Sequence, residues 1–397
     1  MKAVLATVWL LSLRSLLSAA DQQQTQFTDP TLTGDASDEP APSSQRRDPS
    51  GTWRERYGRQ DDLVFTGPLA FSHLPYSRCL EEDDLPAFDV ALLGMPFDTT
   101  VTYRPGARFR AHGHSHREPS HRLARVGLKM VDCGDVPVSP FNNTLALDQM
   151  EVAYSTLLWR DVPDPDRERT VGSTRPFAKD DREHPKIVSL GGDHTIVLPI
   201  LRSLNKVYGP ISVIHFDAHL DTWGPWSRDE PITHGSFFHI AREEGLLSNA
   251  SVHAGIRCKM TSEADLIKDE SYVGFKVIST DDIDDVGISE VIRRIRERVG
   301  ANPVYLSLDI DVIDPGLAPA TGTPEPGGWT TREVKRIIRG LAGLNFVGAD
   351  VVEVAPAYDH ADITSIAAAD IVYDFLSLFV SAEPPKPRRE RTLRDEL

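Results

Sequence analysis

Cysteine is scarce in this chain, which has three of them among 397 residues. Cys79, Cys133 and Cys258 lie far apart, and no two of them form a CxxC pair. This spacing excludes a small domain stapled by several disulfides, and it excludes a thiolate zinc site. We expect buried free thiols. A single disulfide is the alternative if the chain folds in an oxidising compartment.

Basic residues and long apolar runs are also in short supply. The chain has 43 Lys and Arg against 59 Asp and Glu, and its formal net charge is −16. Nucleic-acid binding needs clustered Lys and Arg, so no nucleic-acid partner is expected. After the amino terminus no apolar run is long enough to span a bilayer, so no membrane partner is expected for the mature chain.

The amino terminus has the pattern of a secretory signal. Lys2 precedes the apolar stretch "AVLATVWLLSL", and small residues follow at Ser18 and Ala20. This pattern predicts a signal peptide over residues 1–20. A mitochondrial transit peptide is the alternative, because Ser and Arg are present and the first acid is Asp21. The apolar residues are continuous rather than confined to one helical face, which favours secretion.

The carboxyl terminus and two sequons fit the same route. The chain ends in "RDEL", which resembles the ER-retrieval tetrapeptides KDEL and HDEL but departs from both at its first position. Asn142 and Asn249 each begin an N-glycosylation triplet. We therefore expect the ER lumen or secretion as the destination. A solvated charged tail over residues 383–397 is the alternative interpretation of the ending.

One folded domain is expected between two polar ends. Residues 21–56 are rich in Gln, Asp, Pro and Ser and should form a disordered arm. Residues 57–382 alternate short apolar runs with helical patterns, which is typical of strands buried between two layers of helices. This predicts an α/β fold of three layers, α/β/α, with a mostly parallel central sheet. Residues 161–185 interrupt the pattern and should form a surface insertion.

The expected elements follow from these runs. Strands are expected within residues 88–97, 186–194, 211–219, 251–257, 274–279, 303–311 and 346–354. Helices are expected within residues 195–208, 290–300, 331–344 and 365–380. Thr195 is a plausible N-cap of the first helix, and Gly300 should end the second.

Acidic and imidazole side chains follow three of these strands. "DAHLD" places its polar residues two apart, so they point the same way while the chain stays extended. "LDID" repeats the spacing on another strand, and "GGDH" follows a third. Ligands of parallel sheets bind beyond the carboxyl ends of the strands, so these side chains should meet. The six residues are His194, Asp217, His219, Asp221, Asp309 and Asp311.

These side chains together predict a metal site. Four clustered carboxylates would repel one another and partly protonate, and burying each unpaired charge would cost several kcal/mol. Bound divalent cations remove that cost. Carboxylate and imidazole ligands without thiolate suit Mn²⁺, and suit Zn²⁺ less well. The number of carboxylates predicts two ions with bridging Asp groups.

Longer stretches resemble the ureohydrolase superfamily of arginases and agmatinases, and are most similar to its agmatinase-like branch. They are "FDTTVTYRPGARF", "SLGGDHT", "HFDAHLD", "HGSFFHIA", "SLDIDVIDPGLAPATGTPEPGGWTTRE" and "DVVEVAPAYD". The resemblance covers roughly residues 60–380. It implies an arginase-like fold, two Mn²⁺ ions per subunit, hydrolysis of a guanidino compound to urea and an amine, and assembly into homo-oligomers, as trimers or hexamers.

The resemblance also assigns roles to residues. One ion would be held by His194, Asp217, Asp221 and Asp309. The other would be held by Asp217, His219, Asp309 and Asp311. Glu353 would bind the guanidinium group, which suits a planar cation with paired N–H donors.

Proton transfers are assigned to two further side chains. Asp221 would accept the proton of the attacking water and pass it to the leaving amine, and His234 would assist this movement close to the substrate. His215 shares the orientation of Asp217 and is expected only to support it from behind.

The resemblance favours agmatine as the small cationic substrate, with putrescine and urea as products. Arginase activity and hydrolysis of a guanidino acid such as guanidinobutyrate stay open. An interpretation from outside the enzymes is that the chain is a catalytically inactive metal-binding protein of the secretory pathway. The complete ligand set and the presence of Glu353 and His234 argue against it.

One segment departs from the family pattern. After "RPGARF" the family usually continues with "GP" and then "IR", whereas this chain reads "RAHGHSHREPSHRL". Four histidines fall there, and we expect an altered loop rather than a second metal site. They are His112, His114, His116 and His121.

Overall fold

The computed structural model describes residues 51–58, 70–71, 74–81, 85–108, 128–163, 172–225, 232–260 and 262–385. The predicted signal peptide, the histidine-rich segment and the "RDEL" ending lie outside these residues. The described part of the expected arm contains helix α2 (Trp53–Tyr57), and the Trp53 side chain is buried. The folded domain therefore begins before residue 57, the start that we expected from the sequence.

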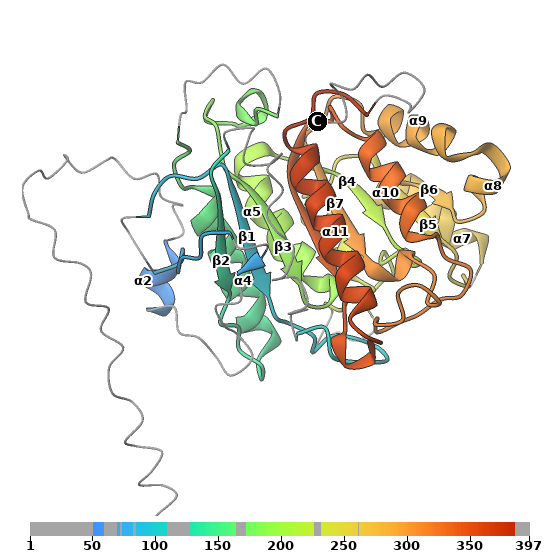
Figure 1. Ribbon diagram of the computed structural model, residues 1–397, viewed down its shortest axis with the longest axis horizontal. Helices are drawn as coiled ribbons and strands as arrows, with labels where there is room; N and C mark the ends of the chain where they lie inside the picture. The colour runs from blue at the N-terminus through green and yellow to red at the C-terminus, as the bar shows by residue number, and fades with distance from the viewer. Residues whose placement is uncertain are drawn as a thin grey trace, which may run out of the picture. The chain divides into compact units, whose positions relative to one another are not determined.

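A fully parallel sheet of eight strands forms the centre of the domain, in the order β2-β1-β3-β8-β7-β4-β5-β6 (Figure 1). The strands are β1 (Val90–Met95), β2 (Met130–Asp135), β3 (Lys186–Gly191), β4 (Ser212–Phe216), β5 (Ser251–Ile256), β6 (Phe275–Ser279), β7 (Val304–Asp309) and β8 (Phe346–Val352). Only β2 was not predicted, because its sequence "MVDCGD" interrupts the apolar residues with two acids and a glycine.

Helices cover both faces of the sheet. The longer ones are α4 (Asn143–Leu158), α5 (Val197–Tyr208), α9 (Ile288–Val299), α10 (Thr331–Gly340) and α11 (Ile363–Leu378). Ala91 and Leu93 of β1 pack in the core under α4 and α5, while Val90 and Leu92 pack in the core under α9, α10 and α11. Figure 1 shows α10 between α9 and α11 on that second face. The predicted three-layer fold is confirmed.

Local sequence explains where the predicted helices begin and end. Gly300, at φ 57°, ends α9 as expected. Thr330 and Glu333 form a reciprocal capping box at the start of α10. The prediction of Thr195 as an N-cap is wrong, because Thr195 lies inside a 3-10 turn (His194–Ile196) and the Asp193 side chain accepts its N–H.

Helix α4 was not predicted from the sequence. Ten of its residues are buried, and they lie on several sides of the helix. Its partly exposed acids, Asp148 and Glu151, are followed by residues 152–158, which are all buried, so the helix lacks the continuous amphipathic pattern by which surface helices are recognised. The short helices α6 (Phe237–Glu243), α7 (Glu263–Lys268) and α8 (Asp282–Val286) complete the described set.

A disulfide joins Cys79 to Cys133 on strand β2, with Cα atoms 5.1 Å apart. The segment that carries Cys79 runs beside β2, where Tyr76 pairs with Asp132. Both cysteines are fully buried, and Cys258 is a buried free thiol. Of the alternatives that the sequence left open, the structure contains the single bridge.

The expected surface insertion is only partly at the surface. Glu183 is buried and accepts hydrogen bonds from the backbone and side chain of Thr174. The buried His184 ring contacts the carbonyl of Leu158 at 2.9 Å. Residues 175, 176 and 179–182 are exposed as predicted, so the prediction is wrong only for Thr174 and residues 183–185, which are buried. No helix in the described part of the chain is long and apolar enough to cross a bilayer.

Candidate metal centre

The carboxyl ends of four adjacent strands bring the candidate residues together. Strands β3, β8, β7 and β4 are consecutive neighbours in the sheet. His194 lies in the turn after β3, Asp309 is the last residue of β7, and Glu353 follows β8 directly. Asp217 follows β4 in the same way. The sheet order thus places side chains far apart in sequence at one edge.

The acidic segments bend where the sequence suggested that they stay extended. Oδ1 of Asp217 accepts the N–H of His219 at 2.5 Å, and Oδ1 of Asp309 accepts the N–H of Asp311 at 2.8 Å. These aspartate turns curl each segment around its first carboxylate. The side chains converge as predicted, but the reason is the turn rather than the alternation of a strand.

Two clusters of ligand-type atoms result. In the first, Nδ1 of His194 lies 3.1 Å from Oδ2 of Asp217, 3.2 Å from Oδ2 of Asp221 and 3.4 Å from Oδ2 of Asp309. In the second, Nδ1 of His219 lies 3.2 Å from Oδ1 of Asp217 and 3.0 Å from Oδ2 of Asp311. Asp217 gives one oxygen to each cluster.

The clusters contain all six predicted ligands. Asp309 was expected to serve both ions, and its contact with a cluster histidine is the one to His194 in the first cluster. His215 also lies within ligand distance of the first cluster, whereas the sequence interpretation gave it only a supporting role.

Hydrogen-bond accounting tests whether a cation fits. Nδ1 of His194 and Oδ2 of Asp217 are buried, and neither makes an aligned hydrogen bond to the protein. Buried polar atoms are nearly always partnered, so these two atoms point to a missing ligand. Imidazole nitrogen and carboxylate oxygen without thiolate suit a divalent cation of Mn²⁺ type. The residues present therefore fit a metal ion.

Burial and repulsion change the protonation of the acids. Burial, with the nearby Asp217 carboxylate adding to it, raises the pKa of Asp221 to about 6. Burial, then Asp311, raises the pKa of Asp309 well above its usual value. Burial lowers the pKa of His194, but its three carboxylate neighbours outweigh this and raise it. A cation entering this site must displace protons.

A buried series of hydrogen-bonded side chains holds His194 on the side away from the cluster. Its Nε2 atom lies 2.8 Å from Oγ of Ser307, and Ser307 donates to Oδ1 of Asp350 at 2.9 Å. Burial raises the pKa of Asp350 to about 6. With Nε2 engaged, Nδ1 is left to face the cluster. The sequence interpretation missed both supports, although Ser307 has the same orientation on β7 as Asp309.

A second series of contacting side chains lies behind Asp217. Nε2 of His215 is 2.9 Å from Oδ2 of Asp217, and Nδ1 of His215 is 2.7 Å from Nδ1 of His253. Nε2 of His253 is in turn 3.2 Å from Oδ2 of Asp269. Burial lowers the pKa of His215 to about 3, so its ring is neutral. His253 and Asp269 were missed, and a histidine inside the apolar strand "SVHAGI" was the available signal.

Glu353 and His234 lie in contact beside the clusters. Oε1 of Glu353 accepts the backbone N–H of His194 at 3.0 Å and lies 3.0 Å from Nδ1 of His234. Oε2 of Glu353 is buried and has no hydrogen-bond partner among the described residues. This free oxygen is available to a ligand that carries N–H donors.

Opposing contacts act on the His234 ring. Burial lowers its pKa, but the Glu353 carboxylate outweighs burial and raises it to about 9. On the other side, Thr102 donates its backbone N–H to Nε2 at 3.1 Å, which requires that nitrogen to be unprotonated. Thr102 belongs to the stretch "FDTTVTYRPGARF" that carries the family resemblance. The position of this loop therefore bears on the charge of His234.

Two of the five non-glycine residues with positive φ in the described part of the chain lie in the candidate site. Asp221 has φ 56° and Glu353 has φ 61°, a left-handed conformation that non-glycine residues rarely adopt. Such strain tends to occur at functional sites, where the surrounding structure holds it. Both residues were predicted to act in catalysis.

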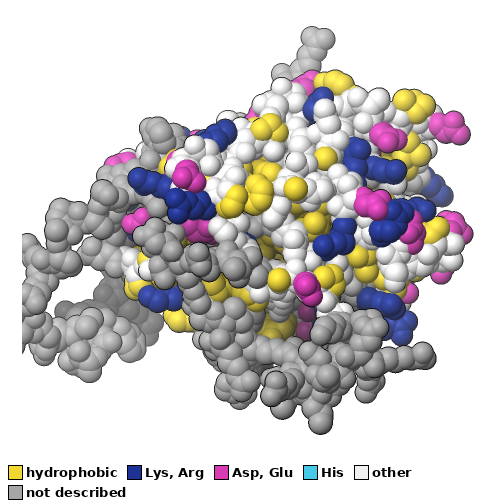
Figure 2. Space-filling view, turned by 90° about the horizontal axis from the view of Figure 1, so that it is seen from above, with side chains coloured by type: hydrophobic (Ala, Val, Ile, Leu, Met, Phe, Trp, Pro, Cys, Tyr) yellow, Lys and Arg dark blue, Asp and Glu magenta, His cyan; other side chains and the backbone are white. Residues whose placement is uncertain are grey.

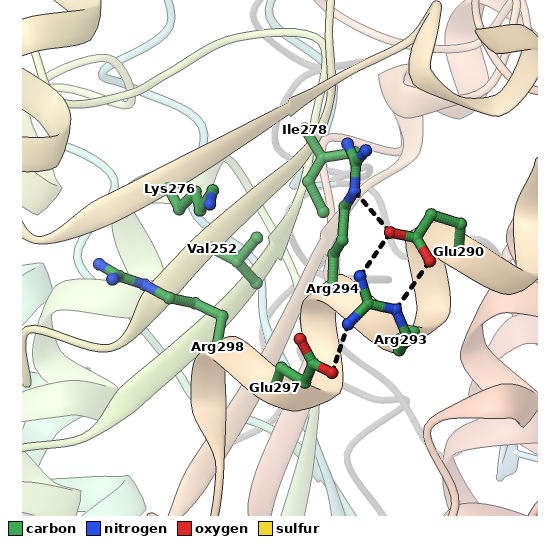
Figure 3. A pocket seen from close by; sticks show the side chains of 8 residues that line it. All are labelled: Val252, Lys276, Ile278, Glu290, Arg293, Arg294, Glu297 and Arg298. Atoms are coloured by element: carbon green, nitrogen blue, oxygen red, sulfur yellow. Dashed lines mark hydrogen bonds and ion pairs between the residues drawn. The ribbon is translucent and has the colours of Figure 1, made fainter. Parts of the chain in front are cut away.

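The described surface shows no comparable cluster of metal-ligand side chains in the view of Figure 2. In the view of Figure 2, Lys and Arg are interspersed with Asp and Glu, and no described histidine is visible. A pocket of about 580 Å³ lies between α9 and strands β5 and β6 (Figure 3). Glu290 there pairs with Arg293 and Arg294, and the pocket shares no residue with the metal clusters.

Comparison with known proteins agrees with this geometry. The sequence model of the arginase family matches residues 88–377. The chain belongs to the arginase family. Putative agmatinase 1 of Schizosaccharomyces pombe is 46% identical over 356 residues, which cover 84% of this chain and 88% of that protein. Putative agmatinase 3 of the same organism is 49% identical over 339 residues, covering 80% and 81%.

A solved structure supports the same membership. Proclavaminate amidino hydrolase from Streptomyces clavuligerus aligns with a TM-score of 0.67 at 32% identity, covering 79% of this chain and 97% of that chain. The resemblance to the agmatinase-like branch of this arginase family is thereby confirmed. All eight predicted site residues lie inside the segment that the family model matches.

Proposed function

We propose that this protein is an amidinohydrolase that uses two Mn²⁺ ions to release urea from agmatine, leaving putrescine. The observation that carries the proposal is the buried, unpartnered Oε2 of Glu353 beside the metal clusters. A guanidinium group presents paired N–H donors in one plane, which match a carboxylate. The relatives named putative agmatinases support agmatine as the carrier of that group.

The ligands divide between the two ions. His194, Asp217, Asp221 and Asp309 would hold one ion, and Asp217, His219, Asp309 and Asp311 would hold the other. When bound, such ions would lower the pKa of a water and supply a nucleophile at neutral pH. The carboxylate-rich donor set favours Mn²⁺ over Zn²⁺.

The chain's own residues orient the substrate and move protons. Glu353 holds the guanidinium so that its carbon faces the clusters. Asp221 accepts a proton and returns it to the leaving nitrogen. His234 contacts Glu353 and, with a pKa of about 9, is suited to donate a proton near the departing amine.

A guanidino acid is the second candidate substrate, and Arg104 is the observation that favours it. The Arg104 guanidinium lies over the Tyr358 ring at 5.3 Å from its centroid. A β-carbon added at Gly322 would meet both the Arg104 carbonyl and Oε2 of Glu353, so the two segments are close. A cation here would attract a substrate carboxylate. Oε1 of Glu325, 3.7 Å from Nε2 of His219, favours the ammonium group of agmatine instead.

Urea release tests the substrate. The purified protein with added Mn²⁺ is assayed on agmatine, arginine and guanidinobutyrate, and agmatine is expected to give the highest kcat/KM. Activity on arginine alone would overturn the choice of agmatine. If stoichiometric ions bind but no substrate yields urea, the chain is an inactive metal-binding protein. Light scattering of the same preparation tests the expected trimer or hexamer.

We also propose that the chain enters the secretory pathway. The Cys79–Cys133 disulfide supports this, because such bonds persist in oxidising compartments. Asn142 and Asn249 are both exposed, as glycosylation acceptors must be. Deleting the last four residues should increase the amount of protein in the medium if the "RDEL" ending retains it. Mitochondrial import of the full chain would refute the proposal.

A further inference from the structure

Arg257 directs its guanidinium group at the main chain near the second cluster. Nη2 donates to the carbonyls of Asp311 at 2.5 Å and Glu325 at 2.6 Å, and Nε also donates to Glu325 at 3.1 Å. Nη1 donates to the carbonyls of Val312 at 3.3 Å and Gly255 at 3.4 Å. All of these acceptors are backbone oxygens, so the side chain joins three segments that are distant in sequence.

One side-chain contact and one main-chain contact of Arg257 reach segments that carry the second cluster. Asp311 is itself a predicted ligand. The backbone N–H of Arg257 donates to the carbonyl of Ala218 at 3.1 Å, and Ala218 stands between Asp217 and His219. The N–H of Ala218 donates to Oδ1 of Asp311 at 3.0 Å, which links the two ligand segments directly. The Arg257 side chain therefore holds the backbone of the turn after β7, while its main-chain N–H holds the turn after β4.

Glu325 extends the same arrangement to His219. Arg257 anchors the backbone of Glu325, and Oε1 of Glu325 lies 3.7 Å from Nε2 of His219. Nδ1 of His219 faces Asp217 and Asp311. At this distance the carboxylate attracts the ring electrostatically without a hydrogen bond, and it favours the orientation in which Nδ1 faces the cluster.

The first cluster is supported differently. His194 is held by Ser307 and Asp350, and none of the Arg257 contacts above reaches His194, Asp221 or Asp309. We propose that Arg257 is a positioning residue that sets the affinity for the ion of the Asp217, His219 and Asp311 cluster and leaves the other ion unaffected. This rests on the proposed two-ion function.

Arginine suits the task because its donors lie in a fixed planar fork. One guanidinium can serve four carbonyls here, whereas a lysine ammonium has three donors on a flexible stem. Methionine would keep much of the side-chain volume and remove every donor. The variants Arg257→Lys and Arg257→Met therefore form a graded series.

Arg298 provides a matched control at the other end of the same strand. Its Nε donates to the carbonyl of Ser251 at 3.1 Å, and its Nη2 donates to the carbonyl of Gly274 at 2.9 Å. Ser251 begins β5, whereas Arg257 follows the end of β5. Figure 3 shows Arg298 extending from α9 at the wall of that pocket, which shares no residue with the metal clusters. Arg298→Met removes the same chemistry far from the ions.

The experiment titrates Mn²⁺ into the full-length wild type and the variants, using calorimetry for affinity and electron paramagnetic resonance for spin coupling. Arg257→Met is expected to weaken one ion about 10- to 100-fold and to leave the other unchanged. In Arg257→Met, the electron paramagnetic resonance signal of two spin-coupled Mn²⁺ ions should be absent when Mn²⁺ is limiting and should return when Mn²⁺ is saturating. Arg257→Lys should shift the same ion by less, and Arg298→Met should shift neither.

Equal weakening of both ions, or unchanged affinities in Arg257→Met, would overturn the proposal. If Arg257→Met does not fold, Arg257→Lys decides the question. The quantity compared is again the loss of affinity for one ion relative to that for the other. Urea release is measured in parallel, and kcat should recover at saturating Mn²⁺ with KM for agmatine unchanged. A wild type that binds two ions but releases no urea would refute the proposed function and leave the Arg257 measurement valid.

Discussion

Oε1 of Glu353 lies 3.0 Å from Nδ1 of His234, and the same oxygen accepts the backbone N–H of His194. One side of the carboxylate is thus used to hold it in place. The other oxygen, Oε2, is buried without a partner. The two residues therefore form one unit, with a fixed half and a half that is free to bind a guanidinium.

The first prediction concerns the charge of Glu353. Glu353→Gln keeps the shape of the side chain and an oxygen for the His194 N–H, but it removes the negative charge that meets the guanidinium. Turnover should fall about 100-fold, because a hydrogen bond between charged groups contributes about 1.5–3 kcal/mol. Both ions should remain, measured as metal content after gel filtration. Unchanged turnover would refute the guanidinium role.

The second prediction concerns proton donation by His234. His234→Asn removes the titrating ring and should lower kcat by about 10²- to 10⁴-fold. In the wild type, activity should fall as pH rises through about 9, because the Glu353 carboxylate favours the protonated ring below that pH once the Thr102 N–H leaves Nε2. The variant should lack this limb of the pH profile.

His239→Asn is the matched control for that experiment. His239 lies on α6, and its Nε2 is 3.4 Å from Oε1 of Glu243 rather than near Glu353. Its kcat and pH profile should equal those of the wild type. A His234→Asn profile that retains the limb near pH 9 would assign that limb to another group.

The third prediction concerns pH and metal affinity. Asp221 has a pKa of about 6 without an ion, so below that pH a cation must displace a proton from it. Above pH 6 the Asp221 carboxylate is already ionised and adds no further pH dependence, while the raised pKa values of His194 and Asp309 should keep the affinity for Mn²⁺ rising with pH. Calorimetric titration from pH 5 to 8 checks this. An affinity independent of pH over that range would contradict the assignment of Asp221 as a ligand.

The same shift has a consequence for stability. An acid whose pKa is raised in the folded state stabilises that state below its unfolded pKa of about 4, and this contribution is lost as pH rises through about 6. A bound ion removes the remaining repulsion. Mn²⁺ should therefore raise the melting temperature more at pH 7.5 than at pH 5.

The fourth prediction concerns the support behind His194. Ser307→Ala breaks the contact between Nε2 of His194 and Asp350. The ion held by His194 should bind about 10- to 100-fold more weakly, while the ion at His219 should be unaffected. Ser377→Ala, which removes a hydroxyl bonded to the Tyr373 carbonyl in α11, is the control. Competition with a chelator measures both affinities.

Much of the fold could be predicted because its strands are continuous apolar runs between two helical layers. Strand β2 and helix α4 escaped prediction for opposite reasons. The acids and glycine of β2 hide its burial, and the burial of α4 on several sides removes its amphipathic pattern. The insertion at 172–185 reads as polar, yet Glu183 is buried with partners inside the protein.

The candidate ligands could be named because each lies at or just after the end of a strand, whereas Glu353 and His234 could be named from the family resemblance of their motifs. Their supports could not. His253 faces His215 only through the register of β5 on β4, and Arg257 reaches Asp311 only because the strand ends converge. Such relationships depend on how strands pair in space, which one sequence does not reveal.

The left-handed conformations of Asp221 and Glu353 also bear on how this protein would respond to laboratory evolution. Glycine adopts that backbone geometry freely, and replacing Asp221 would also remove a repelled charge. A screen that rewards heat tolerance without assaying urea should therefore enrich glycine at these two positions. The most heat-stable variants from such a screen would therefore lack urea-releasing activity.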